Sequence, residues 1–223
     1  MAPSRCGQVP HYRQRAMPGR PPDLRLGRLR FDATSRAVVV AVVDAATAGA
    51  SAPQLLEEGA DAFEVVGSDD TTTLAAAVES LVGAHDVPVL VATRRAAIAD
   101  ACLAVGAAGC DVRGAPDDDA RRCCEAADAT VVIDAESALA LAPSSTRAIV
   151  AAGLAELRAA PDDVGGGRSI LYDARRDRAA SAGAGQALAV ALGARVLLVA
   201  DARTGRRTAD VMAAVLAARM VAR

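Results

Sequence analysis

The chain has 223 residues and a formal net charge of −2, and its residues are 52% hydrophobic but only 2% aromatic. This length suits one α/β domain, because barrels and doubly wound sheets of this size commonly fold as a single unit. A charge this close to neutral excludes general nucleic-acid binding, which needs clustered cations to neutralise phosphates. All 25 basic residues are arginine, so any mechanism that needs a lysine amine is excluded as well.

The first 23 residues are rich in proline and arginine and hold no apolar run long enough for a secretory signal or a membrane span. We expect residues 1–23 to be a disordered leader and residues 24–223 to be the folded domain. With no export signal, the sequence predicts a cytoplasmic protein that does not bind membranes. The five cysteines form no CxxC pair and no Cys/His ligand pattern, so we interpret them as reduced structural thiols.

From residue 24 onward, short β-branched apolar runs alternate with alanine-rich stretches, which predicts repeated βα units and a parallel sheet. The runs are continuously apolar, as expected for strands that are buried on both faces. Seven strands are expected, over residues 38–43, 62–66, 87–91, 109–112, 130–133, 169–172 and 196–199. Helices are expected over residues 52–58, 72–82, 94–105, 117–127, 146–159, 179–192 and 208–222.

Several segments, in order along the chain, resemble those of dihydropteroate synthase. Residues 24–32 are similar to the short N-terminal hairpin of that family and residues 37–44 to its first barrel strand. Further strands of the family are matched by the segments 59–67, 87–93, 106–112 and 192–201. The resemblance implies a TIM-type βα barrel, an α/β fold, and it covers the chain from about Leu24 to its end.

A barrel of that family has eight βα units, whereas the sequence predicts only about seven. The shortfall lies between residues 133 and 169, where one helix and the turn around 165–167 connect two strands and the family's Asp-Pro-Gly motif is missing. The strand at 169–172 matches either the sixth or the seventh family strand. We favour the seventh, because residues 176–181 resemble the segment that leads into the family's penultimate helix. A shortened barrel that is irregular or open at this seam is therefore expected.

The resemblance implies transfer of a pterin-methyl group from its diphosphate ester to p-aminobenzoate, with Mg²⁺ assisting the departure of pyrophosphate. In a βα barrel the residues that carry such chemistry lie at the carboxyl ends of the strands. There the resemblance assigns pterin binding to Asp111, Glu64 and Arg176 and a Mg²⁺ ligand to Asp44. Arg175 and Arg203 are the candidate anion-binding cations. A strand-end carboxylate such as Asp111 can accept two N–H bonds from a guanidine-like edge.

Several chemical groups of the family are replaced in this chain. Ala92 stands where the family has a pterin-binding Asp, while Leu198 and Ala200 stand where it has the Arg and His that grip the diphosphate. Losing one preorganised charge-stabilising group typically costs on the order of a hundredfold in rate. These losses predict a catalytically degenerate member that keeps pterin binding.

Two other readings stay open. One is a divergent active synthase with replacement cations, and the other is a noncatalytic partner subunit of a full-length synthase. Either a homodimer or a heterodimer with such a synthase is expected, because family members pair through the C-terminal helices. The strand-end carboxylates, which include Asp44, Glu64, Asp111, Asp173 and Asp201, should share one mouth and make it net acidic.

Overall fold

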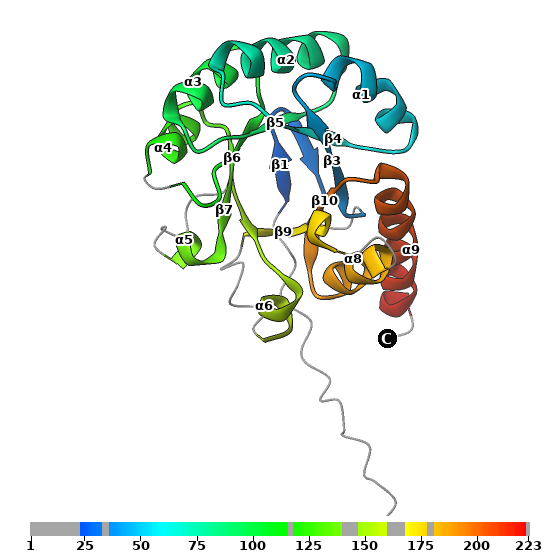
Figure 1. Cartoon of the computed structure of the whole chain (residues 1–223). Coiled ribbons are helices and arrows are strands. Elements are labelled where there is room, and N and C mark those ends of the chain that lie inside the picture. The colour runs from blue at the N-terminus through cyan, green and yellow to red at the C-terminus, as the bar shows by residue number, and fades with distance from the viewer. Residues whose placement is uncertain are drawn as a thin grey trace, which may run out of the picture.

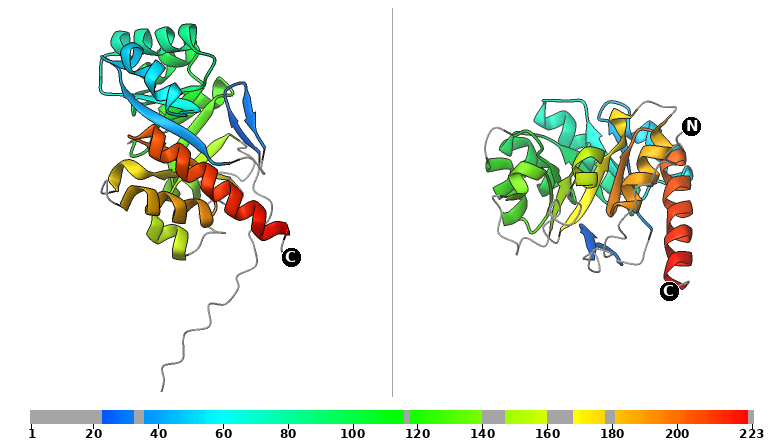
Figure 2. Two further views of the ribbon diagram at one scale, coloured as in Figure 1. Left: turned by 90° about the vertical axis from the view of Figure 1, so that its right-hand side faces the viewer. Right: turned by 90° about the horizontal axis from the view of Figure 1, so that it is seen from below.

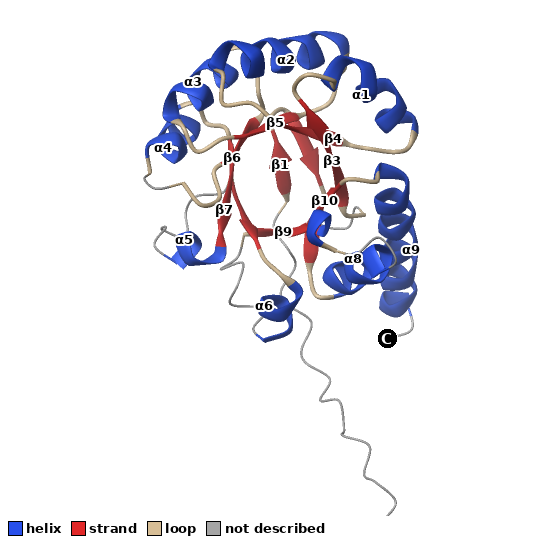
Figure 3. Ribbon diagram, viewed as in Figure 1, coloured by secondary structure: helices blue, strands red, loops and turns tan. Residues whose placement is uncertain are grey.

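The structure, a computed structural model, describes residues 23–32, 36–115, 118–139, 147–159, 168–177 and 181–221. A two-stranded antiparallel hairpin comes first, and eight parallel strands then close into a barrel. Figure 1 looks along this barrel, and the helices form an outer layer around the ring of strands (Figure 3). The TIM-type βα barrel expected from the sequence is confirmed.

The hairpin strands are β1 (Leu24–Leu26) and β2 (Leu29–Phe31). The barrel strands are β3 (Val38–Asp44), β4 (Ala62–Val66), β5 (Val89–Ala92), β6 (Gly109–Asp111), β7 (Thr130–Asp134), β8 (Ala148–Ala151), β9 (Ser169–Asp173) and β10 (Ala194–Val199). The described helices are α1 (Ala48–Glu57), α2 (Thr71–Ala84), α3 (Ala96–Ala104), α4 (Asp119–Ala126), α5 (Ala135–Leu139), α6 (Leu154–Ala159), the 3₁₀ turn η1 (Ala174–Arg176), α8 (Ala182–Ala191) and α9 (Ala202–Val221).

Alternation along each strand divides the core into an inner and an outer part. On β3, Val38 and Val40 point into the barrel, whereas Val39 and Val43 pack outward against helices. All four are at most 2% exposed. Because both faces are covered, the strand sequences are apolar throughout, as parallel sheets require.

The N-terminal hairpin closes one end of the barrel. Leu24 and Leu26 are buried in the same cluster as the inward-facing valines of β3 and β10. The Thr130 hydroxyl at the start of β7 donates a hydrogen bond to the Arg25 carbonyl at 3.0 Å. Figure 2 shows the hairpin lying against the barrel. The opposite end, where the strands reach their carboxyl termini, is the end at which βα barrels carry their sites.

The seam between residues 133 and 169 differs from the expectation. β8 lies in the stretch predicted as a helix over 146–159, and it pairs with β7 through Ile149 and Val132 and with β9 through Ile149 and Ser169. The barrel is therefore closed with eight strands. β9 is the seventh barrel strand, which confirms the favoured assignment of residues 169–172. The strand was missed because its four residues, Ala-Ile-Val-Ala, run into an alanine-rich helix with only Gly153 as a break.

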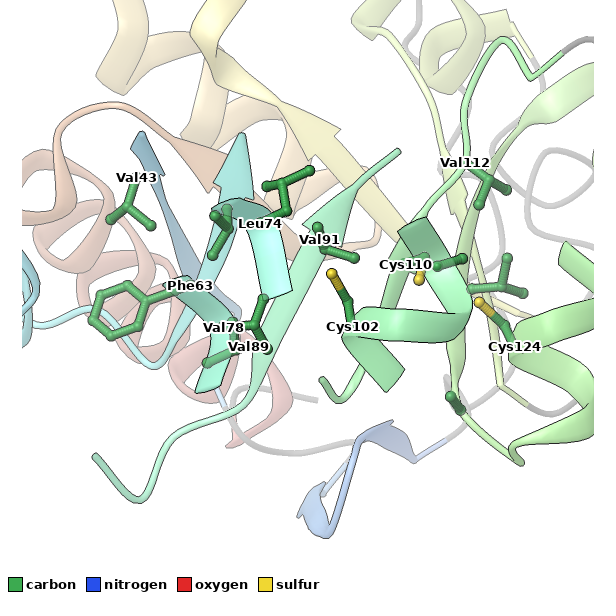
Figure 4. Packing of buried hydrophobic residues seen from close by; sticks show 14 of the residues in the cluster. Val43, Phe63, Leu74, Val78, Val89, Val91, Cys102, Cys110, Val112 and Cys124 are labelled. Atoms are coloured by element: carbon green, nitrogen blue, oxygen red, sulfur yellow. The ribbon is translucent and has the colours of Figure 1, made fainter. Parts of the chain in front are cut away.

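The described cysteines belong to the packing between strands and helices. Cys102, Cys110 and Cys124 are fully buried in the outer core together with Val91 and Val112, as Figure 4 shows. Their thiols are free. Small sulfur-containing side chains fill space in a core that has almost no aromatic rings, in line with the structural role expected for them.

Two expectations fall on residues that the structure does not describe. The leader expected over 1–23 lies outside the described residues apart from Asp23, and so does the turn at 165–167. Among the described helices, none is both long and apolar enough to cross a membrane.

Candidate functional site

Three carboxyl groups meet at the open end of the barrel, although they come from strands far apart in the sequence. Glu64 lies in β4, Asp111 ends β6 and Asp173 ends β9. Two arginines, Arg113 and Arg175, stand two residues after Asp111 and Asp173 and join the carboxyl groups into one network. We call these five residues the mouth cluster.

Arg113 spans the mouth from β6 to β9. Its Nε lies 2.9 Å from both carboxylate oxygens of Asp111, and its Nη2 donates to Asp111 Oδ2 at 2.5 Å. Its Nη1 donates to Asp173 Oδ2 at 3.1 Å, across 60 residues of chain. The guanidinium is thus paired with one carboxylate through two neighbouring nitrogens and with a second through the third nitrogen.

Arg175 likewise pairs with two carboxyl groups, those of Asp173 and Glu64. Its Nε and Nη2 donate to the two oxygens of Asp173 at 2.8 and 2.7 Å. Its Nη1 donates to Glu64 Oε1 at 3.3 Å. The chain of contacts runs from Asp111 through both arginines to Glu64, so two arginine side chains lie across the open end of the barrel.

A short local motif, Asp-x-Arg, produces both arginine positions. In each case the arginine backbone N–H donates to the Asp Oδ1 two residues earlier, at 3.1 Å for Arg113 and 3.2 Å for Arg175. This Asx turn reverses the chain where the strand ends. The turn brings Nε and Nη2 of each arginine to the Asp two residues earlier. The remaining Nη1 reaches a carboxyl group on another strand.

Glu64 is the most perturbed acid of the cluster. Its side chain is fully buried, and that burial, together with the neighbouring Asp111 carboxylate, raises its pKa to about 8. The cations Arg175 and Arg113 oppose the shift without cancelling it. Glu64 is therefore mostly protonated at neutral pH. Its Oε2 accepts no hydrogen bond from the described residues.

Asp173, Arg175 and Arg113 stay charged. Burial works against ionisation of Asp173, but the hydrogen bond from Arg175 and the charges of both arginines hold its pKa below the usual value. Arg175 has a raised pKa because of its hydrogen bond to Asp173. Burial also disfavours the charge of Arg113, yet its bonds to Asp111 and the field of Asp173 raise its pKa overall. Two arginines thus balance the carboxylates of Asp111 and Asp173.

The remaining strand-end acids make local contacts instead. Asp44 Oδ1 accepts from the Ala46 N–H at 2.9 Å, and its other oxygen occupies the space over Gly67. Asp201 accepts from the N–H and hydroxyl of Thr204 at 3.0 and 2.7 Å, so it caps α9. Asp70 caps α2 in the same way through Thr73.

The predicted cations separate into three cases. Arg175 belongs to the mouth cluster. Arg203 instead pairs with Glu58, which follows α1, at 3.3 Å and makes no contact with the cluster. The backbone of Arg176 lies in η1, whereas its side chain is outside the described part of the structure.

The described residues offer no ready metal centre. They contain no group of three or more His, Cys, Asp or Glu side chains that could hold an ion. Asp44 alone supplies carboxylate oxygens at the end of β3. Mg²⁺ bound by Asp44 alone among the described residues would take its other ligands from water and from phosphates of a bound molecule.

The positions at which the resemblance finds the family's chemical groups replaced lie at the ends of β5 and β10. Leu198 points into the barrel and is fully buried among Val40, Leu171 and their neighbours. Ala92 ends β5 beside Asp111, and Ala200 is exposed just after β10. No cationic or carboxyl side chain is therefore available at these three points of the mouth.

Sequence reasoning missed Arg113, which pairs with Asp111 and Asp173. Arg113 and Arg175 balance the charges of Asp111 and Asp173, so the mouth cluster itself is not acidic. Asp44 and Asp201 accept local hydrogen bonds without a cation in those contacts, and the expected net acidic mouth stays a prediction. The signal was present in the repeated Asp-x-Arg spacing after β6 and β9. The same spacing occurs after β10, where Asp201 caps α9 and Arg203 pairs with Glu58. The Asp-x-Arg spacing alone therefore does not predict whether the arginine lies across the mouth.

Solved structures with the same architecture were found by comparison of folds. The Mycobacterium tuberculosis protein Rv1207 is 26% identical, with a TM-score of 0.72 over 81% of this chain and 93% of that one. A Burkholderia cenocepacia dihydropteroate synthase complexed with 7,8-dihydropteroate is 19% identical, with a TM-score of 0.76 over 90% and 98%. A Thermus thermophilus dihydropteroate synthase in complex with 6HMPPP is 21% identical, with a TM-score of 0.74 over 86% and 98%.

No protein-family profile matches the sequence, and no curated protein sequence is significantly similar to it. The likeness to dihydropteroate synthases is thus carried by structure. It confirms the resemblance expected from the strand segments at the level of the fold.

Proposed function

We propose that this chain, whose barrel has the dihydropteroate synthase fold, binds a pterin or a closely related heterocycle at its mouth without performing the synthase reaction. One observation carries the proposal. Glu64 and Asp111 place two buried carboxyl groups side by side at the open end of the barrel. A neutral carboxyl next to a carboxylate offers both a donor and acceptors to the mixed donor and acceptor edge of a pterin ring.

The expected lack of synthase activity follows from the residues that would face the diphosphate. A departing diphosphate must be stabilised by cations or a metal. Leu198 and Ala200 carry no charge, and Arg203 is paired with Glu58. Arg175 is paired with Asp173 and Glu64. A diphosphate would have to break these pairs before it gained a cation, so these arginines are not free to stabilise a departing diphosphate.

Mg²⁺ and Arg176 would take part in binding only when the ligand carries a phosphate. Asp44 would hold Mg²⁺ only together with a ligand that brings phosphate oxygens. Arg176 follows Arg175 in η1 and is the nearest further cation to the mouth in sequence. We expect the protein to lie in the cytoplasm. We also expect residues 24–223 to fold as one domain.

A noncatalytic partner role is the second candidate, and α9 is the observation that favours it. Val211 and Val215 are 61% and 40% exposed on this helix. With Ala214 and Ala218, which are also exposed, they form a stripe at helical spacing. Figure 2 shows the C-terminal half of α9 projecting past the barrel. Such a stripe suits pairing with a second copy or with a full-length synthase.

Two measurements test the proposal. Hydroxymethylpterin should bind the purified chain by calorimetric titration, and Asp111→Asn should weaken the affinity at least about tenfold, since it removes a charge-assisted bond. Asp86→Asn, an exposed residue before β5 at the other end of the barrel, is the matched control and should change nothing. Dihydropteroate should not form from the pterin diphosphate and p-aminobenzoate. Binding that Asp111→Asn leaves intact would refute the placement of the pterin at this mouth.

A further inference from the structure

Arg113 presents to Asp111 the same chemical pattern that a pterin edge would present. Its Nε and Nη2 are two neighbouring N–H donors directed at one carboxylate, at 2.9 and 2.5 Å. The edge of a pterin ring carries a guanidine-like unit with the same paired donors. Both would satisfy Asp111 in the same bidentate geometry, so the two cannot occupy the carboxylate together.

The guanidinium of Arg113 is also held in place from the far side of the mouth. Its side chain is 17% exposed, and its third nitrogen reaches Asp173 at 3.1 Å. Asp111 and Asp173 are themselves only 4% and 8% exposed. Arg113 therefore lies within the mouth between two buried carboxylates, which is where a planar ligand would have to enter.

The buried carboxyl of Glu64 also faces this part of the mouth. Its Oε1 accepts from Arg175, and no described residue donates a hydrogen bond to its Oε2. In the protonated form Oε2 therefore carries the hydroxyl hydrogen and is a donor. A planar ligand that pairs with Asp111 and carries an acceptor towards β4 would receive this hydrogen bond, which Arg113, a donor only, cannot do.

We propose that Arg113 is an internal stand-in for the ligand, so that a heterocycle with a guanidine-like edge binds only when this side chain leaves Asp111. This inference rests on the proposed function, because it concerns the same mouth. Arg113 stands in the turn between Val112 and Ala115, where a side-chain atom on Gly114 would meet no described residue within 4 Å. The described residues therefore do not crowd this turn on the side of Gly114. Arg113 would then set both the affinity and the class of ligand that the mouth accepts.

The energetic consequence is a reduced apparent affinity. When only a fraction of the molecules is competent to bind, the apparent Kd equals the intrinsic Kd divided by that fraction. An arginine with three charge-assisted contacts leaves its site rarely. We expect its removal to tighten the binding of hydroxymethylpterin by at least about tenfold.

The test compares Arg113→Ala with the natural chain by titration of hydroxymethylpterin, followed through the fluorescence of the pterin. Because Arg113→Ala removes one positive charge from a buried cluster and can unfold the chain, the double variant Arg113→Ala, Asp173→Asn, which restores the net charge and leaves Asp111 for the ligand, is measured beside it. Arg147→Ala, which breaks a pair with Asp128 outside the mouth, is the matched control. Tighter binding by both mouth variants and unchanged binding by the control are expected. Adding Asp111→Asn to either mouth variant should abolish the gain.

A second probe separates failure of this inference from failure of the proposed function. Methylguanidine has the head group that Arg113→Ala lacks, so it should raise the melting temperature of that variant, or of the double variant, more than that of the natural chain. Stabilisation by methylguanidine without pterin binding to any variant would support the stand-in and reject the pterin function. Equal pterin affinity of the natural chain and a folded mouth variant would overturn the stand-in and leave the pterin function standing.

Discussion

At the scale of single residues, burial of Glu64 couples its protonation to the stability of the fold. Its pKa is about 8 in the folded protein and near its ordinary value of 4.5 in the unfolded chain. Between these two values a folded molecule holds a proton on Glu64 that the unfolded chain has lost. The contribution of Glu64 to stability is therefore fully present below about pH 4.5 and is lost as the pH rises through about 8.

Substitution of Glu64 by glutamine should remove this dependence. Unfolding in urea at pH 5, 6, 7, 8 and 9 should show the natural chain losing on the order of a few kcal/mol across the series. Glu64→Gln should lose clearly less, since the amide cannot ionise. The exposed Glu57→Gln serves as the control and should follow the natural chain. Parallel curves for Glu64→Gln and the natural chain would show that Glu64 is not the titrating group.

The sequence allowed Glu64 and Asp111 to be placed at the mouth, because both follow or lie in apolar runs whose ends must meet in a parallel barrel. The sequence did not allow Arg113 to be placed there. The direction of the Arg113 side chain depends on Asp173, which lies 60 residues away and becomes its neighbour only when the barrel closes. The pair Asp201 and Arg203 has the same spacing as Asp111 and Arg113, so the sequence did not distinguish the two pairs.

At the scale of elements, the close contact between β6 and β7 depends on Gly109. A Cβ built there would lie 2.0 Å from the Thr130 carbonyl oxygen, which is backbone and cannot move aside cheaply. Gly109→Ala should therefore lower the free energy of unfolding by about 1–3 kcal/mol or more, as overpacking typically does.

Gly83→Ala provides the contrast within the same measurement. Gly83 lies in α2 with open space around its Cβ position, so alanine should be neutral or should stabilise by up to about 1 kcal/mol. Thermal unfolding of both variants checks the pair. If Gly109→Ala is as stable as the natural chain, the strand pairing at Gly109 is looser than the structure indicates.

The strands were predictable where an apolar run stood between polar boundaries, as for β3 and β10. β8 lacked such a boundary because its four residues continue into the alanine-rich segment before α6. Helix propensity favoured one long helix there, whereas closure of the barrel requires a strand to pair with β7 and β9. Tertiary pairing overrode the local preference.

At the scale of the whole molecule, the exposed stripe on α9 predicts association. Val211→Asp should shift the protein towards the monomer in concentration-dependent sedimentation, because it places a charge in the proposed contact. Val82→Asp, at another exposed valine on α2, is the control. A natural chain that stays monomeric at all concentrations would rule out the homodimer and leave a full-length synthase as the partner to be tried.

The fold as a whole could be predicted from the repeated alternation of strands and helices, whereas the pairing of the arginines with carboxylates at the mouth could not. A mouth whose cations are already paired should gain little from a diphosphate on the ligand. The measurement that tests this most directly is the ratio of the Kd of hydroxymethyl-dihydropterin to that of its diphosphate ester, determined with Mg²⁺ present. The expected ratio is about one or less, with no dihydropteroate formed when p-aminobenzoate is added. Binding of the ester that is tighter by about tenfold or more, with turnover approaching a typical ~10 s⁻¹, would contradict it.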